Sequence, residues 1–498
     1  MRHDIVVVGA GAAGAALAAR LSEDPAARVV VLEAGPLDIA PGLLDARRIP
    51  GAQPGHPATV SYPVNLAPGR PWAVPRGRIL GGSTTVSGGY FVRARREDFA
   101  RWSAAGNPQW AYERVLPFLR RMESDLDHPD GDLHGHDGPM LIRRSGLDHP
   151  AAAAFRQSAA ASGFPAETDK NDQGLPGFGP VPCNIEAGIR RNTGLSYLSA
   201  DVRARPNLTV IGECRVNRIL TERRRVTGVA TSRGTVEART VVVCAGAFAT
   251  AQLLLLSGIG PRAELERLGI PVIRDAPAVG TRFSDHPQLV LEWQPRYDHA
   301  PPDGTWLGGC LHLDSSDAAG HQGNLEILQS LVPMASLSSG PADGPPAFLV
   351  SDQTPVRSGT LRLRSADPDR PPFIDYGYLG SRGSLGRLRE AARVTAGIVG
   401  AMPSPGRLLE PGPAVLRDDH ALDDWIRSHL GTSQHTCGTA PMGPPDDGVA
   451  DQHGRVHGVA GLRIADTSLL PDAPQRGPAA TAVLIGELIA DAVRRNGE

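Results

Sequence analysis

The stretch DIVVVGAGAAGAALAARLSEDPAARVVVLEAG, residues 4–35, decides the fold. Ile5–Val8 is a continuous β-branched run, as expected for a parallel strand that is buried on both faces. An alanine-rich helix is expected over Ala15–Leu21, and a second buried strand, Val29–Leu32, ends at the acid Glu33. A strand, a helix and a second strand in this order predict an α/β, Rossmann-like unit.

Three glycines join the first strand to the helix. Gly9 permits the tight turn, Gly11 lets the backbone approach a pyrophosphate, and Gly14 lets the helix pack closely on the strand. The helix N-terminus offers unpaired N–H groups to an anion, and an acid at this distance accepts hydrogen bonds from a ribose. The residues predicted to bind a dinucleotide are Gly9, Gly11, Ala12, Ala13, Gly14 and Glu33. An accidental glycine-rich loop is the alternative, and the motif alone does not separate NAD from FAD.

Composition excludes several classes of protein. The 498 residues carry 51 Lys+Arg against 53 Asp+Glu, a net charge of −2, which argues against a nucleic-acid partner. The only lysine, Lys170, lies in a polar stretch, which argues against Schiff-base chemistry. The cysteines are scattered without a C-x-x-C pair, so no disulfide framework and no metal site is expected. Neither a signal peptide nor a membrane-spanning run is visible, and a cytoplasmic location is predicted.

Further segments repeat this chemistry along the chain. The glycine-rich loop Arg76–Arg95 could approach a flat ring closely, although alone it would be interpreted as a structural loop. Val241–Val243 is another buried strand and leads into a helix at Ala249–Leu256. Arg455–Asp466 is predicted to be a strand that ends in an acid.

Together, in this order, the segments resemble the glucose–methanol–choline (GMC) family of flavoprotein oxidoreductases. Gly77–Arg93 resembles the first signature of the family and Gly246–Pro261 the second. Asp285–Pro287, Ser365–Leu379 and His435–Gly443 resemble three further family segments. The resemblance spans nearly the whole chain. It implies FAD as the cofactor and hydride transfer from a substrate hydroxyl to the flavin N5.

The resemblance also implies two domains and a set of cofactor contacts. Residues 1–145, 186–290 and 420–498 would form the Rossmann-like FAD-binding domain, and residues 146–185 and 291–419 a substrate domain with an antiparallel sheet and helices. Further cofactor contacts are expected at Gly82, Ser83, Ser87, Val216 (through its backbone), Ala245, Asp466, Pro478, Ala479 and Thr481. The loop Arg76–Arg95 has no histidine or cysteine, so FAD is expected to bind non-covalently.

Alcohol oxidation needs a base near the hydroxyl oxygen, and histidine titrates close to working pH. His435 matches the histidine that the family places before the flavin and is the predicted catalytic residue; a buried structural histidine is the alternative. His286 and His457 match positions outside the family's catalytic pair and are interpreted as structural. Cys437 is expected to be a small buried apolar residue.

The sequence departs from the family at one position. The family places a second histidine or an asparagine shortly before the C-terminal helix, expected here at Thr481–Asp491, and this chain has Gly477 there. Either His435 acts alone, or another side chain substitutes for the missing one, with His429, Gln434 and Arg476 as the candidates. The missing side chain is expected to widen the space above the flavin, which would suit a bulky substrate.

Within the family, the mycofactocin-associated branch is the most similar. The segments that carry this likeness are Gly88–Phe91, Glu123–Leu126, Gly135–Pro139, Phe283–Pro287, Asn324–Ile327 and Arg476–Thr481. The likeness implies that the enzyme reoxidises reduced mycofactocin and passes electrons towards the respiratory chain, at the inner face of the membrane. The alternatives are a flavin-dependent oxidase or dehydrogenase of a primary alcohol, a flavin-bearing binding protein without turnover, and an NAD-linked enzyme.

Overall fold

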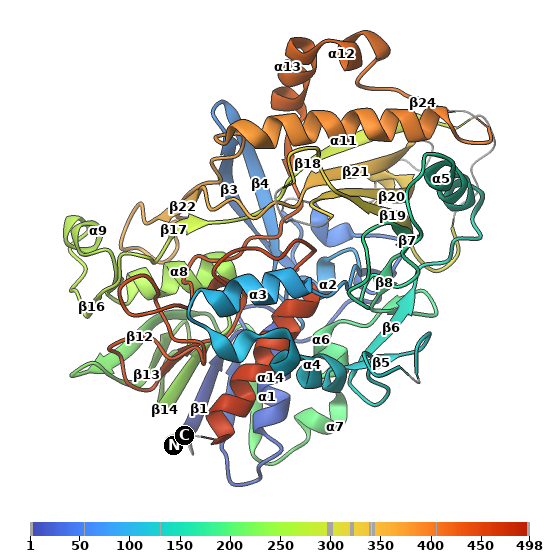
Figure 1. The fold of residues 1–498 in the computed structure, drawn as a ribbon. Coiled ribbons are helices and arrows are strands. Elements are labelled where there is room, and N and C mark those ends of the chain that lie inside the picture. Colours follow the sequence, from blue (N-terminus) through green and yellow to red (C-terminus); the bar gives the residue numbers. More distant parts are fainter. Residues whose placement is uncertain are drawn as a thin grey trace.

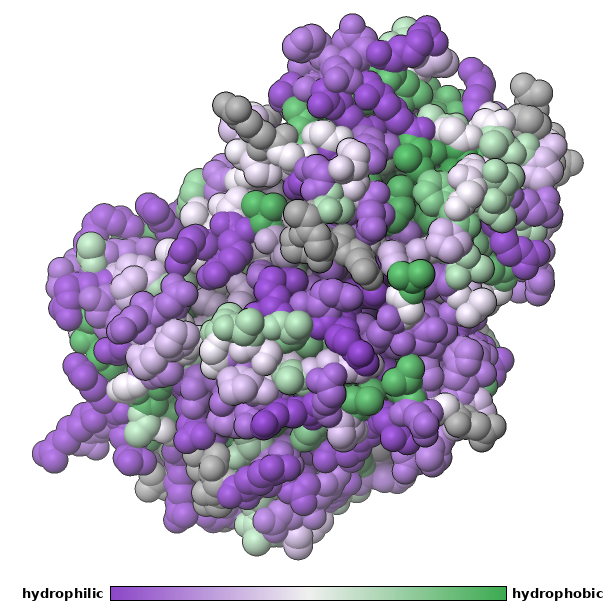
Figure 2. Space-filling model, viewed as in Figure 1, coloured by the Kyte–Doolittle hydropathy of each residue, from purple (hydrophilic) through white to green (hydrophobic). Residues whose placement is uncertain are grey.

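The computed structural model describes residues 3–53, 55–129, 131–295, 302–318, 323–337, 340, 344–404 and 406–495. The helices and strands form two lobes, with the sheet that contains the opening strands in the lower lobe of Figure 1 and a second large sheet in the upper lobe. Hydrophilic residues cover most of the face in Figure 2. Among the helices of the described residues, none is long and apolar enough to cross a bilayer.

The lower lobe is built on a parallel sheet, as the opening stretch predicts. Its parallel strands are β1 (His3–Val8), β2 (Val29–Leu32), β11 (Leu208–Ile211), β14 (Gly234–Val243) and β26 (Leu462–Ile464). An antiparallel extension, β12 (Val216–Glu222) and β13 (Arg225–Thr231), continues from β14. Ile5–Val8 is buried, as expected for a strand covered on both faces.

Helices α1 (Ala12–Leu21) and α14 (Ala479–Arg495) pack against each other in this lobe (Figure 1). A Cβ placed on Gly486 of α14 would lie 2.3 Å from the Ala13 carbonyl oxygen, so only glycine permits this approach. Both helices begin before their predicted starts, and α8 (Ala247–Leu256) also begins two residues early. The predicted strand over Arg455–Asp466 is wrong except at β26, because Gly458 and Gly461 turn the chain at positive φ of 73° and 76°.

The upper lobe holds an antiparallel sheet with helix α11 (Arg382–Gly400) lying across it (Figure 1). Its strands are β24 (Arg407–Leu408), β18 (Pro287–Gln294), β21 (Pro346–Asp352), β20 (Leu325–Pro333), β19 (Leu307–Leu313) and β7 (Phe178–Pro180), with β25 (Gly431–Thr432) beside β18. Strand β18 runs through the predicted domain boundary at 290/291, because Leu289, Leu291 and Trp293 continue one buried face. The predicted boundary therefore falls inside a strand of this sheet.

A third sheet connects the lobes. It pairs β3 (Thr59–Ala67) and β4 (Arg70–Gly77) with β17 (Thr281–Phe283), β22 (Gly359–Arg362) and β23 (Phe373–Asp375). Strands assigned to different domains by the sequence thus share one sheet. The remaining elements are α2 (Ser83–Val86), α3 (Arg96–Ala104), α4 (Tyr112–Arg121), β5 (Glu123–Asp125), β6 (Met140–Arg144), α5 (Pro150–Ala161), β8 (Pro182–Cys183), β9 (Ile185–Glu186), β10 (Ile189–Arg190), α6 (Thr193–Ser196), α7 (Ala200–Arg203), β15 (Ile259–Gly260), α9 (Arg262–Arg267), β16 (Arg274–Asp275), α10 (Met334–Leu337), α12 (Pro413–Arg417), α13 (Asp419–His429), and the 3-10 helices at Pro41–Leu43, Pro50–Ala52, Pro108–Trp110 and Thr467–Leu469.

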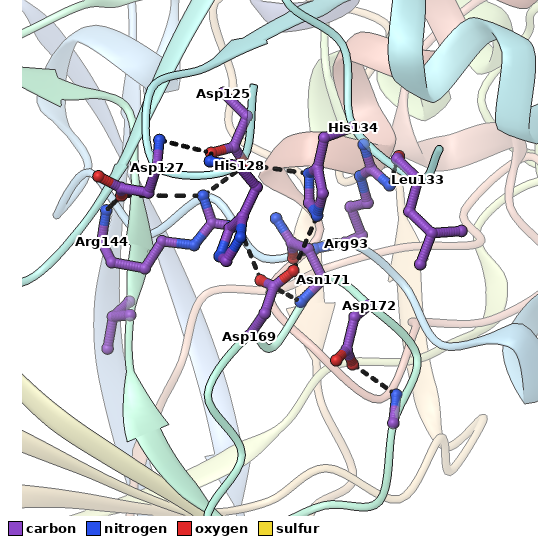
Figure 3. Close-up of polar contacts among 12 residues, drawn as sticks. Arg93, Asp125, Asp127, His128, Leu133, His134, Arg144, Asp169, Asn171 and Asp172 are labelled. Carbon is purple, nitrogen blue, oxygen red and sulfur yellow. Dashed lines mark hydrogen bonds and ion pairs between the residues drawn. The ribbon is translucent and has the colours of Figure 1, made fainter. Parts of the chain in front are cut away.

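A buried group of charges joins several of these segments (Figure 3). The His134 cluster consists of Arg93, Glu123, Asp125, His134, Arg144 and Asp169. The imidazole Nδ1 lies 3.0 Å from a Glu123 oxygen and 2.9 Å from an Asp125 oxygen, and Nε2 lies 2.8 Å from an Asp169 oxygen. Burial alone would lower the pKa of His134, but the hydrogen bonds to the three carboxylates outweigh it and raise the pKa to about 10. The imidazolium therefore balances the acids together with the two arginines.

Removing this imidazolium should destabilise the protein in a pH-dependent way. We expect His134→Gln to cost about 3–5 kcal/mol of the free energy of unfolding near neutral pH, the usual cost of breaking a buried ion pair. Because the folded pKa is raised to about 10, the stabilisation is complete below the unfolded pKa of about 6.5 and disappears as pH rises towards 10. Urea unfolding from pH 6 to 10 measures this, with exposed His420→Gln as the control. A difference between wild type and His134→Gln that stays constant over that range would contradict the assignment.

Candidate active site

The first glycine turn leaves no room for side chains. Gly9 has a φ of 101°, and a Cβ placed on it would lie 2.6 Å from the Cys244 carbonyl oxygen. A Cβ on Gly14 would lie 2.0 Å from the Gly9 carbonyl oxygen. The Ala245 Cα would be 3.3 Å from the added Gly9 Cβ, so the end of β14 borders the same turn. These contacts provide the structural reason for the glycine pattern read in the sequence.

The two glycine-rich loops meet at Gly11 and Gly82. A Cβ on Gly82 would lie only 2.7 Å from the Gly11 Cα, and the N–H of Gly81 donates to the Ala10 carbonyl at 2.9 Å. Gly11 caps α1 without a side-chain hydrogen bond, so the first N–H groups of the helix remain available to an anion. Ser83 accepts a hydrogen bond from the Gly77 N–H at 3.1 Å, and Ser87 caps the end of α2.

Two acids border the same region. Glu33, at the end of β2, accepts hydrogen bonds from the N–H groups of Ala10 and Gly35, each at 2.9 Å, and burial raises the pKa of Glu33 to about 7. Asp466 accepts hydrogen bonds from the Gly246 N–H at 2.9 Å and from the Thr250 hydroxyl at 2.5 Å. Burial raises the pKa of Asp466 as well.

The remaining predicted cofactor residues lie at element ends. Pro478, Ala479 and Thr481 stand at the start of α14, and half-buried Val216 begins β12. The Thr481 hydroxyl is buried and has no hydrogen-bond partner among the described residues. A buried hydroxyl without a protein partner, at a helix N-terminus, is suited to a polar ligand.

The backbone of His435 is hydrogen-bonded to a buried acid, Asp285. Its N–H donates to Asp285 at 2.9 Å, and the same carboxylate accepts hydrogen bonds from the His286 N–H at 2.7 Å and the Thr436 hydroxyl at 2.5 Å. Arg76, at the end of β4, donates to the Gln434 carbonyl and to the Thr436 hydroxyl, both at 2.8 Å. The segment after β25 that carries the predicted base is thus fixed from two sides.

The ring of His435 contacts a second histidine. Its Nδ1 lies 2.9 Å from the Nδ1 of His286, a pairing that the interpretation of His286 as structural did not anticipate. Burial lowers the pKa of His435 below its ordinary value, although Asp285 and Glu326 act in the opposite direction. Burial and the neighbouring His435 lower the pKa of His286 further. Both rings are therefore neutral near pH 7, and one Nδ1 proton suffices for the bond between them.

The space expected at Gly477 is not open. A Cβ placed on Gly477 would lie 3.0 Å from Cε1 of Tyr90 and 3.2 Å from Nε2 of His435. The Tyr90 ring therefore occupies the place where a second side chain would begin, and the prediction of a widened space is wrong. The sequence did not reveal this, because Tyr90 and Gly477 are far apart along the chain.

The three residues considered as substitutes for the side chain missing at position 477 make other contacts. His429 is the last residue of α13 and is exposed, and its ring stacks on Trp425 with 4.2 Å between the ring centroids. Gln434 contributes its backbone carbonyl to Arg76. Arg476 is fully buried and donates to the carbonyl groups of Gly323 at 3.0 Å and Gln475 at 2.6 Å.

Three other residues of interest have simple surroundings. His457 bonds the Gly443 carbonyl at 2.9 Å, which fits its structural interpretation. The Cys437 thiol is buried and donates to the His435 carbonyl at 3.2 Å. Lys170 is fully buried and paired with Glu167 at 2.6 Å, although it lies in a polar stretch of sequence.

Comparison with known proteins identifies the family. The GMC oxidoreductase N-terminal model matches residues 3–288 and the C-terminal model residues 355–486. The chain belongs to the GMC oxidoreductase family. It is 36% identical to an uncharacterised GMC-type oxidoreductase of Rhodococcus erythropolis over 97% of each chain. It is 32% identical to an oxygen-dependent choline dehydrogenase of Brucella anthropi, over 99% of this chain and 95% of the relative.

Solved structures show the same GMC fold. The crystal structure of pyridoxine 4-oxidase from Mesorbium loti is 29% identical, covers 99% of both chains and superposes with a TM-score of 0.91. A formate oxidase structure at 24% identity superposes with a TM-score of 0.88. The predicted fold class is confirmed, and the protein is an FAD-dependent oxidoreductase that acts on CH–OH groups. The NAD-linked alternative is wrong.

The GMC cofactor fits the residues around the glycine loops. The backbone contact between Gly11 and Gly82 leaves N–H groups free for a pyrophosphate. Glu33 lies where its carboxylate could accept hydrogen bonds from the hydroxyl groups of a ribose. The unpartnered Thr481 hydroxyl lies at the start of α14, where the family motif expects a flavin contact. These positions can hold FAD through backbone donors and one hydroxyl.

Closing the contact between the glycine loops should weaken FAD binding. We expect Gly82→Ala to raise the Kd for FAD about 10-fold or more, because overpacking of this kind costs about 1–3 kcal/mol. Gly82 also has a φ of 54°, which adds strain for any side chain. The ratio of flavin absorbance to protein after purification measures the effect. Gly42→Ala is the matched control, since a Cβ there meets nothing within 4 Å. Full FAD content in Gly82→Ala would contradict the close packing.

Proposed function

We propose that this enzyme oxidises a hydroxyl-bearing substrate with His435 as the catalytic base. The observation that carries the proposal is the orientation of His435: its Nδ1 is engaged by His286, while its Nε2 faces the point beside Gly477 and Tyr90. A neutral imidazole with one nitrogen hydrogen-bonded and the other available is suited to accept a proton. Bound FAD supplies the acceptor for the hydride that leaves the substrate carbon.

The surrounding residues prepare His435 for this step. Asp285 accepts the N–H of His435 and Arg76 donates to the carbonyl of Gln434 before it, while His286 contacts the ring, so the histidine is held in place before substrate binds. When Nε2 takes the hydroxyl proton, the ring becomes an imidazolium and its Nδ1–H can donate to the neutral His286. The Asp285 and Glu326 carboxylates favour this positive charge, because both raise the pKa of His435 against the larger effect of burial.

For the substrate, we propose reduced mycofactocin, with electrons passed towards the respiratory chain from a cytoplasmic enzyme that docks at the inner face of the membrane. Three of the segments that resemble the mycofactocin-associated branch meet beside His435. Tyr90 comes from Gly88–Phe91, Glu326 from Asn324–Ile327, and Gly477 from Arg476–Thr481, and the Tyr90 hydroxyl donates to Glu326 at 2.7 Å. Their convergence at one place supports a shared role in substrate recognition.

A small primary alcohol is the second candidate substrate. Two observations favour it: Tyr90 narrows the space next to His435, and choline dehydrogenases are among the relatives with 32% identity. An anaerobic titration distinguishes the candidates. Bleaching of the flavin absorbance by reduced mycofactocin alone would support the first substrate. Bleaching by a primary alcohol such as choline would replace it with the second.

Removing the base should stop flavin reduction without releasing the flavin. We expect His435→Ala to keep its FAD and to reduce it about 10²- to 10⁴-fold more slowly, the usual contribution of a general base. Stopped-flow absorbance with the substrate found in the titration measures the rate. His429→Ala is the matched control, because that histidine is exposed at the end of α13 and was a candidate substitute for the side chain missing at position 477. Equal reduction rates in His435→Ala and wild type would remove His435 from the mechanism.

The same rate should depend on pH in one direction. The base acts when neutral, and burial lowers the pKa of His435 below its ordinary value. We therefore expect the rate of flavin reduction to be constant above about pH 6.5 and to fall as the solution becomes more acidic. A rate that instead rises as pH falls below 6.5 would mean that the protonated ring is the active form.

A further inference from the structure

The backbone of Gly88–Phe91 is clamped, and this fixes where Tyr90 points. The Trp306 indole N–H donates to the Gly88 carbonyl at 2.9 Å, and a Cβ on Gly88 would lie 2.7 Å from the same indole ring. Gly89 has a φ of 82°, and a Cβ there would lie 2.7 Å from Ile185. Because neither glycine could be replaced without moving these neighbours, the Tyr90 side chain is directed onto Gly477 and His435.

The Tyr90 hydroxyl is anchored on a buried carboxylate. It donates to one Glu326 oxygen at 2.7 Å, which also lies 3.0 Å from Nε2 of His312. The other Glu326 oxygen accepts a hydrogen bond from the Gln353 side chain at 3.1 Å. Behind them, Nδ1 of His312 lies 3.2 Å from the ammonium of Lys170. We call Tyr90, Glu167, Lys170, His312, Glu326 and Gln353 the Glu326 network.

Burying the charges of this network costs free energy, and the network holds the phenol of Tyr90 in one position. A buried carboxylate costs several kcal/mol unless its oxygens are hydrogen-bonded, and here every donor is itself held in place. Because the single phenol proton is committed to Glu326, the Tyr90 oxygen can only accept a further hydrogen bond. The ring is half-buried, and it borders the same small space as Nε2 of His435.

We propose that Tyr90 is the specificity-determining residue beside His435: its ring replaces the side chain absent at position 477 and limits the size of the group next to the reacting carbon. Glu326 acts through Tyr90 as a positioning residue. This inference rests on the proposed function of His435, so its tests include measurements that need no turnover.

The first test asks whether Tyr90 occupies the place of a side chain at 477. In FAD-loaded enzyme, Gly477→Asn should lower the Tm by about 2–4 °C, because the new Cβ meets the Tyr90 ring. The same change in a Tyr90→Ala background should cost little, whereas a Tyr90→Phe background, which keeps the ring, should show the full loss. An equal loss in all three backgrounds would overturn the proposal.

The second test measures selectivity with alcohols that cannot react. Tertiary alcohols carry no hydrogen on the carbinol carbon, so they can bind beside the flavin without delivering a hydride. We expect wild type and Tyr90→Phe to bind tert-butanol in preference to 2-phenyl-2-propanol, as followed by perturbation of the flavin absorbance. Tyr90→Ala should shift the ratio of the two dissociation constants about 10-fold or more towards the larger alcohol, the usual effect of reshaping an apolar pocket.

An unchanged ratio in Tyr90→Ala, or no binding of either alcohol to any variant, would overturn the proposal. If wild type binds these alcohols but oxidises neither a primary alcohol nor reduced mycofactocin, the proposed function is refuted. The ratio of the two dissociation constants would then still test the role of Tyr90. Tyr112→Phe, a change on α4 away from His435, is the control for a general effect of losing a phenol hydroxyl.

Discussion

The close approach of Gly11 and Gly82 is the contact on which the rest of the site depends. It brings the N-terminus of α1 against the loop that follows β4, at the place where backbone N–H groups could hold the pyrophosphate of FAD. Strand β4 also carries Arg76 near its end, and Arg76 donates to the Gln434 carbonyl and to the Thr436 hydroxyl, on either side of His435. A shift of β4 would therefore disturb the cofactor end and the catalytic end together. The third sheet, in which β4 pairs with β3, holds that strand in place.

Buried acids are stabilised in two different ways in and around the active site. Next to His435, Asp285 accepts hydrogen bonds from backbone N–H groups and a hydroxyl, and among the described residues it has no ion-pair partner. Farther out, the Glu326 network and the His134 cluster balance acids with buried cations. Burial outweighs the opposing effect of Asp285 and leaves His435 neutral, as a base requires. The second arrangement, with buried cations, gives rigidity, because each charge would be unstable without its partners.

The sequence predicted those parts of the molecule that depend on neighbours along the chain. Strands β1 and β2 follow from runs of β-branched residues, and Glu33 at the end of β2 lies against the glycine turn, where it accepts a hydrogen bond from the Ala10 N–H. The sequence could not show that the Tyr90 ring fills the space at Gly477, since that contact joins distant segments and depends on the clamped glycines before Tyr90. Lys170 was uninformative for the same reason: its polar neighbours in sequence gave no sign that Glu167 and His312 bury it.

The segment Glu167–Asn171 helps to explain why Tyr90 is held rigidly beside His435. Its charged residues belong to two charge groups: Glu167 and Lys170 to the Glu326 network, Asp169 to the His134 cluster. The side-chain oxygen of Asn171 accepts a hydrogen bond from the N–H of Arg93 at 2.8 Å. Arg93 lies three residues after Tyr90 in the chain. Moving this segment would break ion pairs on both of its sides at once. The position of Tyr90 is therefore maintained by electrostatics across the interface between the lobes, and not by apolar packing alone.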